Sequence, residues 1–302
     1  MNKIGDSIEA FLESRRAKRS SVRTVEWYAQ QLNVYVTFAD AKNLDAYDSD
    51  TVESFLRSQQ NLNLSESTIH ARFRALRAFM RWHTKRKKRK RETFDNPMDY
   101  VDAPQVSKRK PRVANPEHLK KLILTIGAAT FADIRDKFIV RLLWSTGLRV
   151  DEACHLEMSD VDLVEGFVMV RGGKGSKDRL CPFDEVFRTA YLEYLINRPE
   201  TTCKSLLLTV GGKSANFTTG LLPNGVRQMF RRRCADAKIP LVNPHSIRHL
   251  YAIERLNNGM SLSAVSAAMG HTSVSFTASN YAKWQTSGLR REYDIASKYQ
   301  SA

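Results

Sequence analysis

The stretch that decides how this chain folds reads Pro-His-Ser-Ile-Arg-His at 244–249, Ala-Met-Gly-His at 268–271 and Ser-Asn-Tyr-Ala-Lys-Trp at 279–284. His245 and Arg248 lie one helical step apart, so on a helix both side chains point to the same face. His271 follows a glycine that can end a helix, and Tyr281 comes at the end of the next short helical stretch. The spacing therefore predicts that two imidazoles, a guanidinium and a phenol reach one place.

Two further cationic side chains stand far upstream, each in a short motif. Arg149 belongs to Thr-Gly-Leu-Arg-Val-Asp-Glu at 146–152, and Lys174 belongs to Gly-Gly-Lys-Gly-Ser-Lys-Asp-Arg at 172–179. Together with the four groups above, they resemble the active site of the tyrosine recombinase family, also called phage-type integrases. The resemblance covers most of the chain, from about the first helix to Trp284, and it rests on the combination of motifs rather than on any single one.

The resemblance implies an enzyme that cleaves and rejoins DNA strands through a 3′-phosphotyrosine intermediate and a Holliday junction. Tyr281 is then the nucleophile, because a tyrosine can attack a phosphodiester and form a covalent intermediate. Arg149 and Arg248 are suited to clamp the phosphate oxygens, since a guanidinium binds them in a bidentate manner that lysine lacks. His271 is expected to form a hydrogen bond with a phosphate oxygen.

In this interpretation, Lys174 and His245 are the residues that transfer protons. Lys174 is expected to protonate the leaving 5′ oxygen, and His245 is expected to assist proton transfer or to orient Tyr281. In the family, the acidic residue at the position of Glu152 supports the site. The phosphotyrosine conserves the bond energy and cationic side chains stabilise the charge, so neither a nucleotide nor a metal ion is expected as a cofactor.

Each of these residues also has an ordinary structural interpretation, and neighbours compete for several roles. The competitors are Lys177 for the lysine, His249 for the first histidine, and Tyr293 and Tyr299 for the tyrosine. The His-x-x-Arg spacing favours His245 over His249.

The length of the chain allows two domains, and its charge suggests a polyanionic partner. The chain has 302 residues, with 48 Lys and Arg against 32 Asp and Glu, which gives a net charge of +16. Such an excess favours a polyanionic partner, most often nucleic acid, over a basic protein without one. The four cysteines form no Cys-x-x-Cys pair, so zinc is not expected. Without a signal peptide or a membrane span, the expected location is the cytoplasm, in association with the nucleoid.

The sequence predicts a mostly α-helical fold with a small β-sheet. Residues 1–95 contain four amphipathic segments at helical spacing, which indicates a helical bundle, and the resemblance implies a SAM-like core DNA-binding domain. The last of these helices, which starts at Ser65, has an arginine face that continues into a basic run. Phosphate contact is favoured over a merely solvated face. The candidate DNA-binding residues are Arg74, Arg77, Arg81, Lys85, Arg86, Lys87 and Lys88.

The rest of the chain is predicted to be a linker and a catalytic domain. Residues 96–112 contain prolines among basic residues and are predicted to form an extended linker. Residues 113–302 are then the mixed α/β catalytic domain, in which 166–182 reads as a β-hairpin with Lys174 at its glycine-rich turn. Residues 289–300 form a predicted tail helix, which docks on its own domain or, as is frequent in the family, on a neighbouring protomer.

The resemblance implies double-stranded DNA with inverted-repeat sites as the partner. It also implies a monomer when free, a homotetramer on synapsed DNA, and accessory DNA-bending proteins. A type IB topoisomerase-like enzyme would share the chemistry without exchanging strands, and a non-catalytic DNA-binding protein would not need the full set of groups. A metal-dependent relaxase is disfavoured, because His245, His249 and His271 do not have the spacing of metal ligands.

Overall fold

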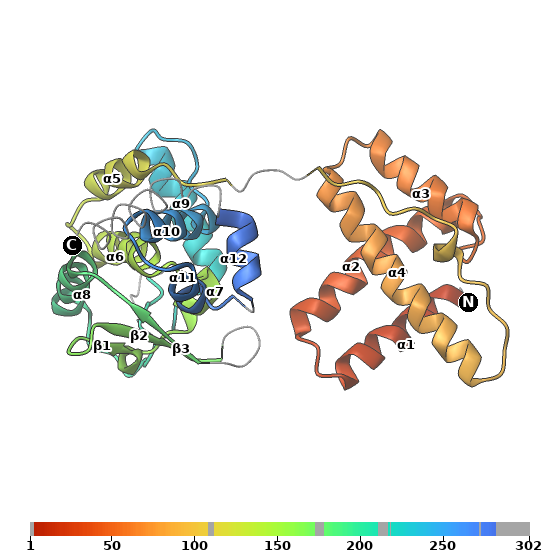
Figure 1. Ribbon diagram of the computed structural model, residues 1–302, viewed down its shortest axis with the longest axis horizontal. Coiled ribbons are helices and arrows are strands. Elements are labelled where there is room, and N and C mark those ends of the chain that lie inside the picture. Colours follow the sequence, from red (N-terminus) through yellow and green to blue (C-terminus); the bar gives the residue numbers. More distant parts are fainter. Residues whose placement is uncertain are drawn as a thin grey trace, which may run out of the picture. The chain divides into compact units, whose positions relative to one another are not determined.

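The computed structural model describes residues 3–107, 112–172, 178–210, 217, 219–271 and 273–281. The chain divides into two compact units, Met1–Arg109 and Lys110–Ala302, and each has its own hydrophobic core (Figure 1). The division falls within the stretch 96–112 that was expected to be a linker. Several predicted features lie outside the described residues: Lys174, Lys177, Tyr293, Tyr299 and the tail 289–300.

The described part of the first unit consists of four α-helices and one short 3-10 helix. Their bounds are α1 Lys3–Ala17, α2 Val22–Ala41, α3 Ser49–Asn61, α4 Glu66–Arg89 and η1 Pro97–Asp99. Serine side chains begin two of them, because Ser21 and Ser65 accept hydrogen bonds from the backbone N–H groups of Thr24 and Thr68, both at 3.2 Å. The predicted N-terminal helical bundle is confirmed.

Aromatic rings dominate the core of the first unit. Phe11 is fully buried, and its ring centroid lies 5.7 Å from that of Phe79 and 5.6 Å from that of Trp82. The hydroxyl of the buried Tyr35 donates to the carbonyl of Ala46 at 2.8 Å, so its burial leaves no unpaired hydroxyl. Burial of each large apolar side chain contributes about 1.5–3 kcal/mol, which holds α1, α2 and α4 against one another.

The described part of the second unit contains eight α-helices, one 3-10 helix and three strands. Their bounds are α5 Pro116–Thr125, α6 Phe131–Thr146, α7 Val150–His155, η2 Met158–Asp160, β1 Val161–Asp162, β2 Phe167–Val170, β3 Arg179–Pro182, α8 Glu185–Asn197, α9 Pro223–Asp236, α10 Pro244–Asn257, α11 Leu262–Met269 and α12 Val274–Tyr281. Side-chain caps begin five of the helices: Asn115, Thr130, Asp184, Asn243 and Ser261.

The three strands form one antiparallel sheet in the order β1-β2-β3. Val168 on β2 pairs with Cys181 on β3, and both side chains are fully buried. On the opposite face Leu180 is 50% exposed, as the alternation of a half-buried strand requires. The mostly α fold with a small sheet is confirmed, and β2 and β3 are the predicted hairpin.

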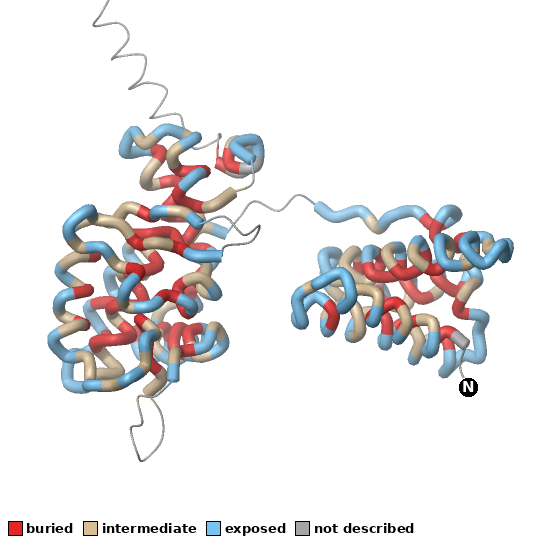
Figure 2. The backbone as a smooth tube through the Cα atoms, turned by 90° about the horizontal axis from the view of Figure 1, so that it is seen from below, coloured by how far each residue is buried: buried red, intermediate tan, exposed pale blue. Residues whose placement is uncertain are grey.

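Helix α6 is the central helix of the second unit, and it packs against both α8 and α10. A capping box between Thr130 and Asp133 begins α6, and Gly147 ends it. The buried ring of Phe138 stacks on Tyr194 of α8 with centroids 4.8 Å apart. Buried residues, red in Figure 2, lie along the inside of each unit. The buried α6 fixes the turn at Gly147, from which the candidate site is built.

Candidate active site

The turn after α6 requires a glycine. Gly147 has a φ of +63°, a left-handed conformation that costs other residues about 1–2 kcal/mol. A Cβ atom at this position would also lie 2.4 Å from the ring of Tyr251. The carbonyl of Gly147 accepts a hydrogen bond from Nη1 of Arg248 on α10 at 2.7 Å. The turn thus joins the end of α6 to a predicted catalytic arginine.

Arg248 is almost completely buried, with 2% of its surface exposed. Besides the carbonyl of Gly147, its guanidinium donates to the carbonyl of Met269 at the end of α11. Burial and the nearby charge of Arg149 lower the pKa of Arg248 to about 10, so it is still a cation at neutral pH. Two backbone carbonyls therefore hold one positive charge where α6, α10 and α11 meet.

Glu152 holds the other predicted arginine. Arg149 is the residue before α7, and the carboxylate of Glu152 accepts hydrogen bonds from its backbone N–H and from its Nη1, both at 2.8 Å. Although burial raises the pKa of Glu152, hydrogen bonds from Arg179 and Arg149 lower it to about 2. The ionised carboxylate thus orients Arg149, whose side chain remains 32% exposed and open to a ligand.

Arg179 is a site residue that the sequence reasoning misses. It begins β3 and donates two hydrogen bonds to Glu152 at 3.1 and 2.8 Å. Its Nε also donates to the carbonyl of Ala268 on α11 at 2.8 Å. A signal is present in the sequence, because strand alternation places Arg179 on the same face as Cys181. An arginine on a buried face needs an acidic partner.

His271 follows the turn that ends α11. Gly270 is left-handed, with a φ of +63°, and His271 Nδ1 lies 2.7 Å from Oγ1 of Thr277 on α12. Burial and the charge of Arg248 lower the pKa of His271 to about 4, so its imidazole is neutral at pH 7. When the hydroxyl of Thr277 donates to Nδ1, Nε2 carries the hydrogen and can donate to an anionic oxygen.

The predicted nucleophile is buried. Tyr281 ends α12 with 2% of its surface exposed, and it belongs to a small apolar cluster with Tyr251, Leu256 and Val265. Burial raises the pKa of Tyr281 to about 12. Its Oη lies 2.5 Å from Nδ1 of His249 on α10, in a hydrogen bond.

The two histidines of α10 lie one helical turn apart, with ring centroids 4.7 Å apart and ring planes at 79°. His249, rather than the predicted His245, makes the hydrogen bond to Tyr281. His245 does share the electrostatic environment of Arg248, because burial and then that charge lower the pKa of His245. The His-x-x-Arg spacing identifies neighbours on one helix face, and it does not reveal that His249 reaches α12.

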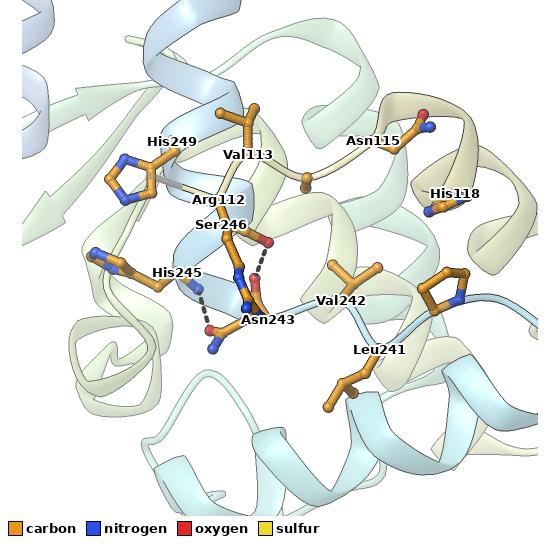
Figure 3. Close-up of a pocket in the computed structure, with 12 residues that line it drawn as sticks. Arg112, Val113, Asn115, His118, Leu241, Val242, Asn243, His245, Ser246 and His249 are labelled. Atoms are coloured by element: carbon orange, nitrogen blue, oxygen red, sulfur yellow. Dashed lines mark hydrogen bonds between the residues drawn. The ribbon is translucent and has the colours of Figure 1, made fainter. Parts of the chain in front are cut away.

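Two hollows lie beside these histidines. A cavity of about 450 Å³ is lined by residues that include His118, His245 and His249 (Figure 3). A smaller one of about 170 Å³ is lined by residues that include Arg149, Arg227 and His245. The smaller hollow therefore offers two guanidiniums to an anion such as a phosphate.

Most of the predicted catalytic groups come together around the ends of α6, α10 and α11. They are Arg149, Glu152, His245, Arg248, His271 and Tyr281. The arrangement gathers two guanidiniums, an imidazole that is neutral at pH 7 and a phenol, groups whose chemistry suits an anionic phosphate. In the part of the chain that the structure describes, no group of three or more His, Cys, Asp and Glu side chains could hold a metal ion. None of the described helices combines the length and apolar character needed to cross a membrane.

The predicted DNA-binding residues all lie on α4 of the first unit. Six of them are exposed, namely Arg74, Arg77, Arg81, Lys85, Arg86 and Lys88. Lys87 is half-buried and forms an ion pair with Glu92. The guanidinium of Arg74 lies 5.8 Å from the ring centroid of Trp27, and that of Arg86 lies 5.3 Å from that of Trp82. These aromatic contacts hold part of a basic face in place.

Two family models match this chain. The model of the Phage integrase family matches residues 113–287, and that of the N-terminal SAM-like domain of phage integrases matches residues 8–87. The chain is 28% identical to the tyrosine recombinase XerC of Bacillus pumilus over 299 residues, which cover 95% of this chain and 94% of that protein. It is also 28% identical to the tyrosine recombinase XerA of Thermococcus kodakarensis, over 98% of this chain and 95% of that protein.

Solved structures share the fold over almost the whole chain. The XerH site-specific recombinase bound to palindromic difH substrate, in a post-cleavage complex, has a TM-score of 0.72 at 20% identity, over 94% of this chain and 82% of that one. The Tn1549 transposon integrase in complex with transposon right end DNA has a TM-score of 0.74 at 17% identity, over 96% of this chain and 99% of that one. Because the integrase model spans more than half of its residues, the chain belongs to the phage integrase family, the tyrosine recombinases, and is an enzyme that breaks and rejoins DNA.

Proposed function

We propose that this site-specific DNA recombinase uses Tyr281 as its nucleophile and works through a 3′-phosphotyrosine intermediate and a Holliday junction. One observation carries the proposal: Arg149, Arg248, His271 and Tyr281 come from separate turns and helices to one place. Burying charged and polar groups together costs free energy, so their convergence favours a bound anion.

In the cleavage step, Oη of Tyr281 attacks the scissile phosphorus, and the bond from phosphorus to the 5′ oxygen breaks. The phenol proton passes to a base, and the leaving 5′ oxygen takes up a proton from an acid. Rejoining reverses the step, with a free 5′ hydroxyl attacking the phosphotyrosine. Because the phosphotyrosine keeps the bond energy, the cycle consumes no nucleotide.

Charge on the non-bridging oxygens rises in the transition state, and the described cations are proposed to stabilise it. Arg149 and Arg248 supply the guanidiniums, and His271 supplies a neutral N–H donor at Nε2 when the hydroxyl of Thr277 donates to its Nδ1. Glu152 keeps Arg149 in place through two hydrogen bonds of 2.8 Å. Because these donors are held before the substrate arrives, each one is expected to contribute about 10²–10³ to the rate.

We assign protonation of the 5′ oxygen to Lys174. In the sequence Lys174 lies between Val170, at the end of β2, and Arg179, at the start of β3. Val170 and Arg179 pair with each other, and Arg179 contacts Glu152. His245 lines the smaller hollow with Arg149, and burial and nearby arginines lower its pKa. It is therefore suited to relay a proton or to hold a phosphate oxygen in that hollow.

The proposed substrate is duplex DNA with inverted-repeat sites. The basic face of α4 is expected to bind phosphates, which contribute affinity without sequence information. Each protomer has one such nucleophile, while exchange between two duplexes requires four strand cleavages. The active form is therefore a homotetramer on two synapsed sites, assembled from free monomers with accessory DNA-bending proteins. A net charge of +16 favours association with the nucleoid.

Covalent trapping followed by a recombination assay tests this function. DNA bound covalently to the protein in cells is sequenced, and two copies of the recovered site are placed on a plasmid. We expect wild type to recombine the two sites. Tyr281→Phe, which keeps the packed ring, should bind the site without forming an adduct or a product. Relaxation of a plasmid with one site or none would instead indicate a type IB topoisomerase-like enzyme, and binding without an adduct would indicate a non-catalytic DNA-binding protein.

A further inference from the structure

The hydroxyl of Tyr281 forms its hydrogen bond with His249, a residue outside the predicted catalytic set. The distance between His249 Nδ1 and Tyr281 Oη is 2.5 Å, at the short end of the range for an O–H donor. We propose that His249 is the general base that takes the proton from Tyr281 during cleavage. This inference rests on the proposed function, in which Tyr281 is the nucleophile.

The surroundings of His249 keep its imidazole unprotonated in the free protein. Burial, followed by the effects of His245 and Arg248, lowers the pKa of His249 to about 4, so the imidazole is neutral at pH 7. With the phenol as donor, Nδ1 is the accepting nitrogen and Nε2 carries the hydrogen. Among the described residues, the titratable and charged groups that face it are Tyr281 from α12, His245 and Arg248 from α10, His271 after α11, and, around the cavity, Arg112 and His118.

His249 also connects the buried phenol to open space. Tyr281 is 2% exposed, so its proton has no direct route to solvent. His249, by contrast, lines the cavity of about 450 Å³ shown in Figure 3. After Nδ1 takes up the phenol proton, Nε2 can release its own proton into the cavity, which returns the imidazole to its neutral form.

Binding of DNA makes this transfer more favourable. The positive charge of Arg248 opposes protonation of His249 in the free protein, and a bound phosphate offsets that charge. The complete step forms the bond from Oη to phosphorus and breaks the bond to the 5′ oxygen. It moves one proton from Tyr281 to His249 and another from Lys174 to the 5′ oxygen. Protons and charge therefore balance without a further reactant.

A substrate with sulfur in place of the bridging 5′ oxygen distinguishes loss of the general base from loss of the general acid. A thiolate leaves without being protonated, so the substitution rescues a variant that lacks the acid and does not rescue one that lacks the base. Single-turnover cleavage is measured with oxygen and sulfur versions of a suicide duplex that carries the trapped site. His249→Asn should be slower by about 10²-fold or more on both, whereas Lys174→Ala should be slow only with oxygen. His118→Ala, which alters the same cavity, should stay within about threefold of wild type.

A second readout separates proton transfer from support of the fold. A fluorinated tyrosine at position 281 has a lower phenol pKa and depends less on a base. It should restore about tenfold or more of the cleavage that His249→Asn loses. Absence of that rescue, rescue of His249→Asn by sulfur, or cleavage by His249→Asn within about threefold of wild type would each overturn the proposal. If His249→Asn does not fold, His249→Gln is held to the same criteria. A wild-type protein that forms no adduct would instead overturn the proposed function.

Discussion

Glu152 accepts two hydrogen bonds from Arg179, at 3.1 and 2.8 Å, in an ion pair whose side chains are only 9% and 10% exposed. The same carboxylate accepts two hydrogen bonds from Arg149. The pair therefore joins strand β3 to the start of α7, where Arg149 lies. A single buried carboxylate connects two parts of the site that are far apart in the sequence.

Removal of Arg179 should destabilise the second unit. Arg179→Met leaves the buried charge of Glu152 with only the half-exposed Arg149 as its partner, so the free energy of unfolding should fall by up to about 3–5 kcal/mol. Lys120→Met is the matched control, because it removes a mostly exposed pair with Glu117 and should cost at most about 1 kcal/mol. Urea unfolding measures the free energy of unfolding of both variants. Adding Glu152→Gln to Arg179→Met should cost less than the two single changes together, and simple additivity would contradict the coupling.

Two left-handed glycines allow a comparison of steric contact with backbone strain. Gly147→Ala and Gly166→Ala both place an alanine at positive φ, which costs about 1–2 kcal/mol. Only the alanine at Gly147 meets a neighbour, the ring of Tyr251 at 2.4 Å, whereas nothing lies within 4 Å at Gly166. Gly147→Ala should therefore lose more stability, and it alone should slow cleavage, since its carbonyl holds Arg248. Thermal unfolding and cleavage assays compare the two variants. If both lose the same stability and the same cleavage rate, the contact with Tyr251 does not matter.

Local patterns in the sequence account for much of the fold and for part of the site. The helix from Ser65, the hairpin 166–182 and the turn at Gly147 each depend on residues near one another in the chain. The pairing of Arg149 with Glu152 is likewise local, at i and i+3.

Contacts between distant segments are what the sequence does not reveal. Arg179 and Glu152 are 27 residues apart, and His249 and Tyr281 are 32 apart. Motif spacing identifies the residues that share a helix face. It does not identify the face against which a later helix packs. For this reason the spacing favours His245, whereas His249 contacts the phenol of Tyr281.

Lysine at either arginine position should preserve binding and slow the chemistry. Arg149→Lys and Arg248→Lys keep the charge but lose the guanidinium fork, so cleavage should fall by about 10²–10³. Arg248→Lys should also lose about 1–3 kcal/mol of stability, because the carbonyls of Gly147 and Met269 lose a donor. Gel-shift measures DNA binding, single-turnover assays measure the cleavage rate, and urea unfolding measures stability. Arg188→Lys on α8 is the control. Cleavage within about threefold of wild type would remove that arginine from the site.

Acid should destabilise the protein through two half-buried histidines. The pKa values of His249 and His271 fall from 6.5 to about 4 on folding. Between these values the unfolded chain binds protons that the folded chain does not, so the free energy of unfolding falls as the pH drops from 6.5 towards 4. Above 6.5 both states are neutral and the contribution vanishes. His249→Asn with His271→Asn should flatten the curve, whereas the exposed control His155→Asn should not. If the double variant keeps the same dependence of unfolding free energy on pH, the two histidines are not its cause.

DNA binding should depend on salt through the face of α4. Each phosphate contact adds about 0.9 to the slope of log affinity against log salt. If Arg74, Arg77 and Arg81 each bind a phosphate, changing all three to Gln should reduce the slope by about 2.7. Lys42→Gln with Arg57→Gln is the control, since both residues are exposed and lie outside α4. A slope that the triple variant leaves unchanged would show that the arginine face is merely solvated.

The position of the covalent bond to DNA tests the central assignment most directly. Protein trapped on a suicide duplex is digested with a protease and a nuclease, and the peptide that retains a nucleotide is identified by mass spectrometry. We predict that the modified residue in wild type is Tyr281, attached through a 3′ phosphate, and that Tyr281→Phe yields no modified peptide. A nucleotide on Tyr293 or Tyr299, or an adduct that survives in Tyr281→Phe, would contradict the assignment of Tyr281 as the nucleophile.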